Sequence, residues 1–339
     1  MAVAIQRGAP QFLTLVAAAG FCGCGTAAST TVSKGGDAAR GRHTGGVSNQ
    51  AEASPRMKVA SVGRLPSPVQ DPATTALGDR ALLMGGLDAA DVSVAAIVAA
   101  AGAATRTLGR LPYAVHDAAA ATIAGRAYLI GGGEPSYSEI TAVSSAGRAS
   151  VAGELPVKAS DVAAGSLDGT VYVVGGYTGT AALDTIVAWS GSGRARVVAR
   201  LPHPLRYAAV APAAGRLIIA GGTSGERATA DVYAFDPATD AVRRMATLPR
   251  PLTHAGAAAL GGAVYVVGGR GATQGTQTAQ ILAIDPHSGR LSRAGRLPTA
   301  LSDAGVTAYG DAVLVAGGRE AGGALSDRVI LLRARSGAR

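Results

Sequence analysis

Six residues suited to acid–base or hydrogen-bonding chemistry recur at one position of six related segments. Each lies six residues after the leucine of a Leu-Pro pair, and the series reads Asp71, Asp117, Asp161, Tyr207, His254 and Asp303. Four aspartates in register favour a repeated structural role, in which each carboxylate accepts backbone N–H groups where the chain enters a strand. Tyr207 and His254 interrupt that pattern in neighbouring segments, so they are the first candidates for binding or catalysis.

Other polar side chains are predicted to lie at the same end of the fold. Arg206 and His116 each precede a member of the series, and with Tyr207 and His254 they would place a cation, an imidazole and a phenol at one mouth. Such a rim suits a sugar or a peptide carboxylate, because arginine makes bidentate contacts. The alternative is that loop residues are polar because loops are solvated. The candidate ligand-binding residues are His116, Asp117, Glu134, Tyr177, Arg206, Tyr207, His254, Arg270 and Arg319, and no catalytic residue is assigned.

The elements that must position these residues also repeat six times. Leu-Pro pairs begin at Leu65, Leu111, Leu155, Leu201, Leu248 and Leu297. Gly-Gly pairs begin twenty residues later in each case, at Gly85, Gly131, Gly175, Gly221, Gly268 and Gly317. Successive repeats lie 44 to 49 residues apart, whereas the interval inside a repeat is constant. Six repeats of this length with strand-like content predict an all-β, six-bladed β-propeller with four strands in each blade.

Each repeat contains two strand signals before its glycine pair. A strand of small residues, such as 255–260, is followed by a glycine turn and then by an apolar strand, such as 264–267. Continuous apolar runs bounded by glycine are typical of strands buried on both faces. The uncharged stretch 92–104 is too short for a membrane-spanning helix of ~20 residues, and it is predicted to form outer strands of the first blade.

These repeats resemble the kelch-repeat family. The apolar strand and its glycines read Val171-Tyr-Val-Val-Gly-Gly in the third repeat, and Phe235-Asp-Pro-Ala-Thr carries the Asp-Pro segment of the family pattern. The late tryptophan of that pattern is missing from its expected place in every repeat. The resemblance implies a kelch-type propeller with ligand sites at one mouth of its channel, where the loops entering the innermost strands meet those that follow the Gly-Gly pairs.

The two ends of the repeat array indicate how the ring closes. Residues 57–62 look like the outermost strand that precedes every other Leu-Pro pair, and residues 328–333 form one more strand after the last Gly-Gly pair. We therefore expect residues 58–62 to pair with the final strand, so that both ends of the chain build the sixth blade. Such pairing covers an edge that otherwise promotes aggregation.

The N-terminal segment has a different character. Arg7 precedes an apolar stretch from Phe12 to Phe21, and Cys22-Gly-Cys-Gly follows. This resembles a bacterial lipoprotein signal, with Cys24 as the lipidated residue because the small Gly23 precedes it. The alternatives are a cleaved secretory signal without lipid and an uncleaved segment. The expected domains are a signal peptide with a lipobox (1–24), a disordered Ser/Thr/Gly-rich linker (25–56) and the propeller (57–339). The protein is then exported, and either lipid-anchored to the outer face of the cytoplasmic membrane or secreted.

Composition limits the classes of partner. The net charge of +9 suits an acidic polymer or an anionic membrane, but the positive residues form no runs and indicate a solvated, arginine-biased surface. Aromatic residues make up 4% of the chain, too few for stacking on nucleic-acid bases. No metal site or cofactor is predicted, since both cysteines lie outside the repeats. The expected partner is a protein or a glycan at the cell envelope, bound by a monomer whose membrane contact is the lipid anchor alone.

Two functions remain open from the sequence. The first is a binding or scaffold module of the cell envelope that presents a polar channel mouth to its partner. The second follows from a resemblance to secreted six-bladed kelch proteins that interconvert sialic acid anomers. It is a sugar epimerase or mutarotase, with proton transfer and carboxylate contacts supplied by His254, Glu134, Arg206 and Arg270. Kelch-containing copper oxidases are a poor match, because they need a cysteine that the repeats lack.

Overall fold

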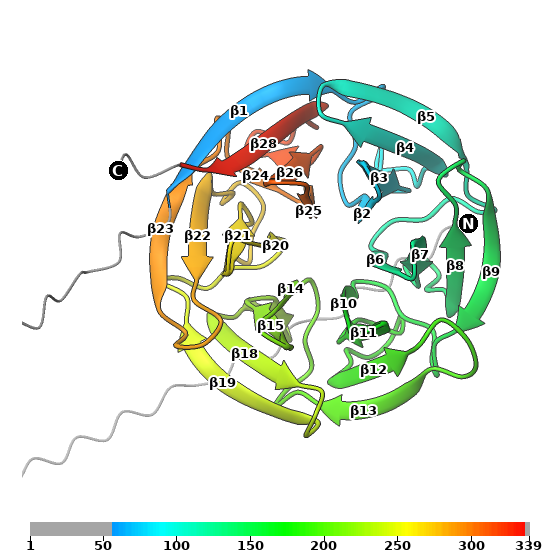
Figure 1. Cartoon of the computed structure of the whole chain (residues 1–339), viewed down its shortest axis with the longest axis vertical. Helices are drawn as coiled ribbons and strands as arrows, with labels where there is room; N and C mark the ends of the chain where they lie inside the picture. Colours follow the sequence, from blue (N-terminus) through cyan, green and yellow to red (C-terminus); the bar gives the residue numbers. More distant parts are fainter. Residues whose placement is uncertain (1–55, 336–339) are drawn as a thin grey trace, which may run out of the picture. The chain divides into compact units, whose positions relative to one another are not determined.

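The computed structural model describes residues 56–335, which form six four-stranded antiparallel sheets around a central channel (Figure 1). Every regular element in this range is a β-strand, and within it no helix is long and apolar enough to cross a membrane. The all-β, six-bladed propeller predicted from the repeats is confirmed. The predicted signal peptide, its lipidation site Cys24 and residues 25–55 of the predicted linker lie outside the described residues.

Each of the first five blades is built from one continuous stretch of chain, with its strands in order from the channel outward. Blade 1 has β2 (Ala73–Leu77), β3 (Arg80–Met84), β4 (Ala96–Ala101) and β5 (Ala104–Arg110); blade 2 has β6 (Ala119–Ile123), β7 (Arg126–Ile130), β8 (Glu139–Val143) and β9 (Ala149–Glu154). Blade 3 has β10 (Ala163–Leu167), β11 (Thr170–Val174), β12 (Thr185–Trp189) and β13 (Arg196–Arg200). Blade 4 has β14 (Ala209–Ala213), β15 (Arg216–Ala220), β18 (Asp231–Asp236) and β19 (Ala241–Thr247); blade 5 has β20 (Gly256–Leu260), β21 (Ala263–Val267), β22 (Gln280–Ile284) and β23 (Leu291–Arg296). Two short pairs complete the set, β16 (Thr223–Ser224) with β17 (Arg227–Ala228) and β24 (Leu301–Ser302) with β27 (Arg319–Glu320).

Blade 6 is built from both ends of the described chain. Its strands are β25 (Gly305–Tyr309), β26 (Ala312–Ala316), β28 (Arg328–Ala334) and, outermost, β1 (Met57–Arg64). The antiparallel register of β1 with β28 runs from Met57 opposite Ala334 to Arg64 opposite Arg328, and a bulge lies between Ser61 and Gly63. Residues 58–62 thus lie along the final strand, as the ends of the repeat array predict.

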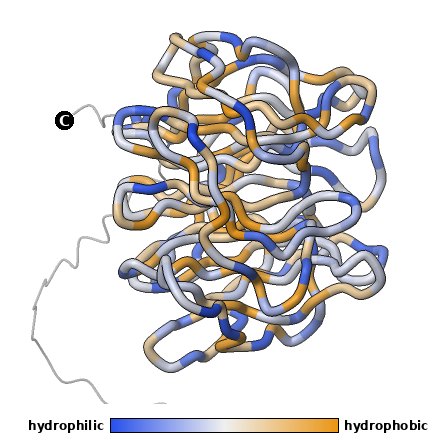
Figure 2. Tube along the Cα trace, turned by 90° about the vertical axis from the view of Figure 1, so that its right-hand side faces the viewer, coloured by the Kyte–Doolittle hydropathy of each residue, from blue (hydrophilic) through white to orange (hydrophobic). Residues whose placement is uncertain are grey.

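Apolar side chains hold neighbouring blades together. Each of the six buried clusters in the described chain joins two adjacent blades. One of them packs Tyr128 of blade 2 against Trp189 of blade 3, with ring centroids 4.9 Å apart. Figure 2 shows hydrophobic stretches running through the interior and hydrophilic segments at many of the turns. Because a blade is covered on both faces, its middle strands are apolar throughout instead of alternating.

The first glycine of each pair lies where two backbones approach closely. Gly175 has a φ of +62°, and a Cβ at this position would clash with the carbonyl oxygen of Leu205. The next residue, Gly176, donates its N–H to that same oxygen at 2.9 Å. A residue without a side chain tolerates both the positive φ and the close approach. The glycine pair therefore ties the end of β11 to the loop that leads into blade 4, and so positions the loops at one mouth of the channel.

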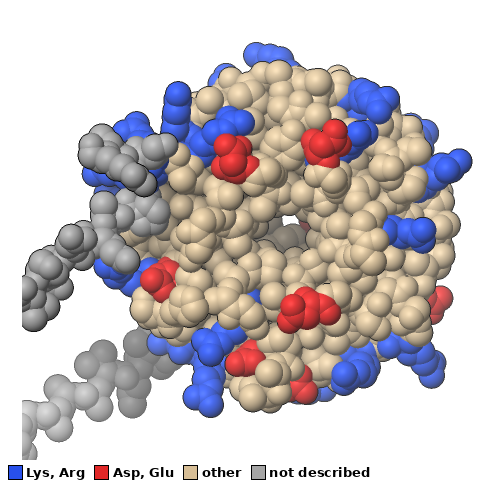
Figure 3. All heavy atoms as spheres, in the orientation of Figure 1, with Lys and Arg blue, Asp and Glu red and all other residues tan. Residues whose placement is uncertain are grey.

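The innermost strands line the channel with small side chains. A cavity of about 360 Å³ inside the channel is bounded by all six inner strands, through residues such as Thr75, Ala121, Ser166, Ala211 and Ala258. Figure 3 shows the channel opening at the centre of one face. The small-residue strands predicted from the repeats therefore leave the axis of the propeller open instead of filling it.

Candidate functional site

One mouth of the channel is formed by six residues in register, which we call the mouth ring. They are the series found in the repeats, and their φ angles all lie between 52° and 61°: Asp71, Asp117, Asp161, Tyr207, His254 and Asp303. A left-handed backbone is uncommon for residues that carry a side chain, although Asp and His adopt it more often than most. Six such residues at equivalent positions indicate strain that is shared around the mouth.

Backbone hydrogen bonds join the members of the mouth ring to one another. Five of them donate their N–H to the carbonyl oxygen of the neighbouring member: Asp161 to Asp117 at 2.8 Å, Tyr207 to Asp161 at 3.0 Å, His254 to Tyr207 at 3.3 Å, Asp303 to His254 at 3.0 Å and Asp71 to Asp303 at 2.8 Å. These N–H groups are satisfied along the ring, so the side chains are left to face the channel.

The loops that follow the Gly-Gly pairs lie directly behind the mouth ring. β-bridges join the residue before a ring member to a residue just after a glycine pair, as between Gln70 and Leu87 and between Thr253 and Arg270. The short strands β24 and β27 make the same connection in blade 6. The two sets of loops therefore meet at this mouth, where the resemblance to kelch propellers placed the ligand site.

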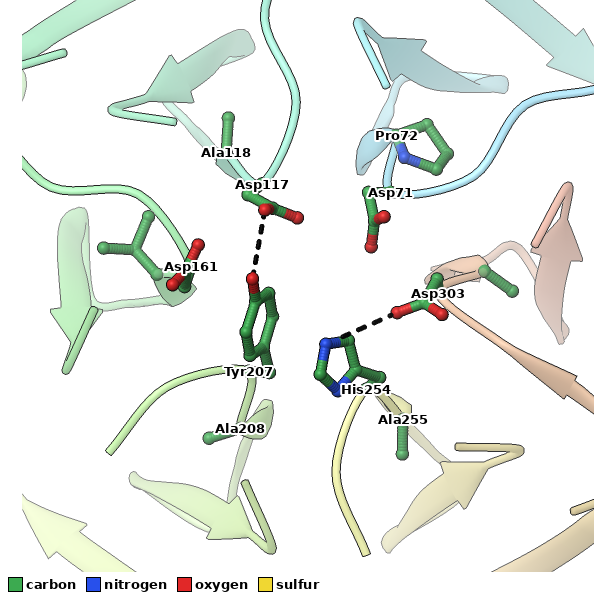
Figure 4. A pocket seen from close by; sticks show the side chains of 12 residues that line it. Asp71, Pro72, Asp117, Ala118, Asp161, Tyr207, Ala208, His254, Ala255 and Asp303 are labelled. Atoms are coloured by element: carbon green, nitrogen blue, oxygen red, sulfur yellow. Dashed lines mark hydrogen bonds and ion pairs between the residues drawn. The ribbon is translucent and has the colours of Figure 1, made fainter. Parts of the chain in front are cut away.

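The side chains of the mouth ring surround a cavity of about 120 Å³ (Figure 4). The rest of its wall comes from the residue that follows each ring member: Pro72, Ala118, Val162, Ala208, Ala255 and Ala304. Figure 4 shows Tyr207 directed toward Asp117 and His254 directed toward Asp303. The polar side chains at this mouth therefore form one layer, and mostly small apolar residues lie immediately beneath it.

The four carboxylates of the mouth ring do not accept backbone N–H groups, which is the structural role expected of them. In the part of the chain that the structure describes, no backbone N–H donates to any of the four. Asp161 accepts a hydrogen bond from Nε of Arg206, and Asp117 accepts one from the Tyr207 hydroxyl at 3.1 Å. The Ser302 hydroxyl donates to Asp303 at 2.5 Å. The expectation fails because the backbone N–H groups are already bonded around the ring.

Burial and mutual repulsion alter the acidity of three ring carboxyls. Burial, followed by the negative charges of Asp303 and Asp117, holds the pKa of Asp71 well above its usual value. Burial and the charges of Asp161 and Asp303 act in the same way on the pKa of Asp117, and burial raises the pKa of Asp303. Like charges in a poorly solvated site disfavour ionisation. A ligand that donates hydrogen bonds or carries positive charge would therefore be stabilised in this cavity.

Arg206 neutralises one carboxylate of the mouth ring. Its guanidinium forms an ion pair with Asp161 and lies over the ring of Tyr177, 4.2 Å from the centroid. Such a contact adds a cation–π attraction to the charge pairing. The structure thus brings Arg206 and Tyr177 together beside the cavity. Because the guanidinium already has a carboxylate partner, it is a poor receptor for a carboxylate of a ligand.

The surroundings of His254 hold it neutral. Burial, followed by the positive charges of Arg270 and Arg206, keeps the pKa of His254 well below its usual value. Arg270 donates to Nε2 at 3.0 Å, and Nδ1 lies 3.0 Å from the Thr253 hydroxyl. A guanidinium cannot accept a hydrogen bond, so Nε2 is the acceptor and Nδ1 carries the proton. The imidazole also stacks on the ring of Tyr207, with centroids 3.8 Å apart.

One oxygen of Asp303 accepts no hydrogen bond from an N–H or hydroxyl group in the described structure. The side chain is 4% exposed, and its Oδ1 is buried without such a donor. The Nε2 atom of His254 lies 3.8 Å away, but this nitrogen accepts its hydrogen bond from Arg270. A buried acceptor without a partner costs free energy. The Asp71 and Asp303 carboxyls also form a side-chain hydrogen bond, which favours a protonated Asp71 and an ionised Asp303, so Asp71 is the donor available to Asp303 within the ring.

Three of the nine candidate residues line the cavity itself: Asp117, Tyr207 and His254. His116 lies behind the ring, with Nε2 3.7 Å from the Asp117 carboxylate, and burial lowers its pKa. Arg319 pairs with Asp91 at 3.2 Å in the loop of blade 1. Glu134 is exposed on its loop. The candidate set thus divides into cavity residues, supporting residues around them, and rim residues farther from the ring.

Three members of the mouth ring are missing from the candidate set, namely Asp71, Asp161 and Asp303. Their shared position in the repeats is a sufficient signal for a common site, although four aspartates in register also favour a structural role. Within residues 56–335, no group of three or more His, Cys, Asp or Glu side chains is arranged to hold a metal ion.

Comparisons with known proteins agree with this architecture. The kelch motif family matches residues 204–249, which span the end of one repeat's Leu-Pro loop and the whole of blade 4. A solved structure described as "Structure of YjhT" superposes with a TM-score of 0.70 and 16% sequence identity, covering 81% of this chain and 100% of that chain. At this identity the likeness concerns the fold alone. No curated protein shows a significant match to the sequence.

Proposed function

The chain belongs to the kelch-repeat β-propeller family, and from this premise we propose that it is a binding module of the cell envelope. The mouth ring receives hydrogen-bond-donating groups, either hydroxyls or ammonium, from a glycan or protein partner. The observation that carries the proposal is the concentration of carboxyl acceptors in the wall of the cavity, where Asp303 lies beside Asp71 and Asp117. The neighbouring carboxyls of Asp71 and Asp117 add acceptors whose ionised forms are penalised until a donor arrives.

The size of the cavity favours part of a larger partner over a whole small molecule. Pockets that enclose drug-sized ligands measure roughly 300–1,000 Å³, whereas the cavity inside the mouth ring measures about 120 Å³. A single sugar edge or the end of one side chain fits that space. The envelope location rests on the N-terminal sequence, in which Cys24 follows an apolar stretch and a small residue.

Catalysis of sugar anomer interconversion is the alternative function, and one observation favours it. The raised pKa values of Asp71 and Asp117 bring carboxyl groups toward the range in which they exchange protons near neutral pH. His254 is less suited to that task than the sequence indicates, because both of its ring nitrogens are occupied by Arg270 and Thr253.

The proposed binding is tested by thermal unfolding of the full chain against monosaccharides, sialic acids, cell-wall fragments and lysine-containing peptides. A ligand at about 100 times its dissociation constant adds roughly 2.7 kcal/mol of stability. Asp303→Asn keeps the shape and tolerates the left-handed backbone, but it removes the negative charge, and we expect it to weaken binding about tenfold. The matched control is Asp311→Asn, at an aspartate that is 83% exposed on a turn, and its affinity should equal that of the unaltered chain.

Equal binding by Asp303→Asn and the unaltered chain would contradict the role of the mouth ring. Interconversion of sugar anomers, followed by nuclear magnetic resonance and lost in Asp117→Asn, would favour the alternative function over a pure binding module.

A further inference from the structure

Four arginines converge on a groove at the circumference of the propeller, far from the channel. We call it the arginine groove: it has a volume of about 300 Å³ and is lined by Arg56, Arg293, Arg296 and Arg335, with Met57, Ala294 and Gly295 between them. It lies where β23 of blade 5 ends and β1 of blade 6 begins (Figure 1). Figure 3 shows that Lys and Arg side chains are frequent at the circumference and absent from the edge of the channel opening on the face in view.

The backbone beneath these arginines is firmly held. Arg335 donates its N–H to the carbonyl oxygen of Arg56 at 2.8 Å, which continues the ladder of β1 and β28 by one residue. Met57 and Ala294 are 4% and 2% exposed in the apolar cluster that joins blades 5 and 6. A Cβ on Gly295 would lie 3.7 Å from the oxygen of Met57, so the two strands are in close contact there. The groove is therefore a fixed feature of the ring closure.

None of the four guanidinium groups has a carboxylate within ion-pair distance among residues 56–335. Two other arginines at the equivalent position of their repeats are paired, Arg64 with Asp327 at 2.6 Å and Arg200 with Asp184 at 2.5 Å, whereas Arg110 of blade 1 has no carboxylate partner in the described chain. The four arginines of the groove thus bring positive charges together without compensation from the described chain.

The repeat explains why Arg296 lacks a partner. In blades 6 and 3 the leucine after the arginine donates its N–H to the carbonyl oxygen of the partner aspartate, Asp327 or Asp184. In blade 5 the same hydrogen bond, from Leu297, goes to Ala279, and in blade 1 the one from Leu111 goes to Ala95. The carboxylate that neutralises Arg64 and Arg200 is therefore replaced by a methyl group at the groove.

We propose that the arginine groove binds a phosphate-bearing ligand. Arginine presents a planar fork of donors that matches phosphate oxygens bidentately, and it does so more specifically than lysine. A polyanion would also relieve the repulsion among four guanidinium groups held on a fixed backbone. The phosphate has two sources, a soluble phosphate compound or the headgroup of an anionic lipid. A lipid anchor on the predicted site Cys24 would hold the propeller at a bilayer, whose anionic headgroups carry phosphate.

The experiment uses the full chain and two probes, pyrophosphate in titration calorimetry and phosphatidylglycerol vesicles in flotation with phosphatidylcholine vesicles as reference. We expect binding to pyrophosphate or to phosphatidylglycerol that falls at least tenfold in Arg293→Gln/Arg296→Gln. The matched control, Arg194→Gln/Arg196→Gln, removes the same charge from exposed positions of blade 3 and should bind as the unaltered chain does. Comparing variants within the full chain cancels any contribution of the N-terminal segment to flotation.

A third variant tests the missing carboxylate directly. Ala279→Asp restores the residue that blades 3 and 6 have at this position, and the added carboxylate should pair with Arg296 and weaken phosphate binding. Loss of pyrophosphate binding identifies a soluble ligand, and loss of vesicle binding alone identifies a lipid headgroup; both support the proposal. Absence of binding to both probes, or an equal loss in the control variant, would overturn it.

Discussion

A chain that starts at Gly63 should be far less stable than one that starts at Ala53, because it lacks most of β1. The truncation removes Met57, which is 4% exposed in the core between blades 5 and 6. Removal of a buried methionine side chain alone costs about 2–5 kcal/mol, and each lost backbone hydrogen bond adds about 0.5–1.5 kcal/mol. Since whole domains are stable by only about 5–15 kcal/mol, we expect the shortened chain to be largely unfolded at 37 °C.

The exposed edge of β28 gives this prediction a second readout. Without β1, the strand from Arg328 to Ala334 presents unpaired backbone groups and an apolar sequence, the conditions under which edges associate. Urea unfolding measures the stability, and light scattering measures aggregation. Equal urea midpoints for the two chains would show that β1 contributes nothing to closure of the ring.

The order and number of the blades followed from the sequence because a physical contact recurs at a fixed spacing. The N–H of each repeat leucine bonds a carbonyl at the start of the third strand in its blade, as Leu111 does with Ala95 and Leu201 with Asp184. Twenty residues later, the first glycine of the pair lies against the backbone of the next blade. Both contacts depend on backbone geometry, so they tolerate wide variation of side chains while the interval remains constant.

The chemistry of the mouth could be predicted only in part, because it depends on which backbone N–H groups are already hydrogen-bonded. Aspartates before a strand commonly accept N–H groups of their own backbone. Here the left-handed φ of residues such as Asp161 turns the N–H toward Asp117 of the preceding blade. That arrangement frees the carboxylates for the channel. No spacing in the sequence distinguishes the two outcomes, which differ by the backbone conformation of a single residue in each repeat.

The clustering of the four arginines in the groove also could not be predicted from the sequence. Runs of charge along the chain are the usual signal for a basic surface, and this chain has none. Arg56 and Arg335 become neighbours only because the two ends of the chain pair, and Arg293 and Arg296 join them only because blades 5 and 6 are adjacent in the ring. A surface assembled by ring closure has no counterpart in local composition.

Asp71→Asn should stabilise the protein at neutral pH, which is the opposite of the usual effect of a substitution at a buried site. Burial, and then the charges of Asp303 and Asp117, raise the pKa of Asp71 in the folded state. A raised pKa means that folding favours the protonated form, so the contribution of Asp71 to stability is complete below its usual pKa of 3.8 and is lost as the pH rises through the folded-state value. Asparagine never ionises and tolerates a φ of 52°, so the variant avoids that loss.

The gain should therefore depend on pH in a defined direction. At pH 8 we expect Asp71→Asn to be more stable by about 1–2 kcal/mol, the usual yield of relieving an unfavourable interaction, and to melt a few degrees higher. The difference should shrink as the pH falls and disappear near pH 4. Asp161→Asn is the matched control at the same position of the repeat; it should lower stability at pH 8, because Arg206 would lose its carboxylate.

Melting curves of the unaltered chain, Asp71→Asn and Asp161→Asn between pH 4 and pH 8 test this prediction. A destabilised Asp71→Asn, or a gain that does not change with pH, would show that the carboxyl of Asp71 is not under electrostatic strain. The expected gain would mean that the fold retains a carboxylate that opposes its own stability. Retained strain of this kind is characteristic of residues kept for binding or catalysis. The same variant should then bind a hydrogen-bond-donating ligand more weakly, so that the substitution raises the stability of the fold and lowers the affinity of the mouth ring.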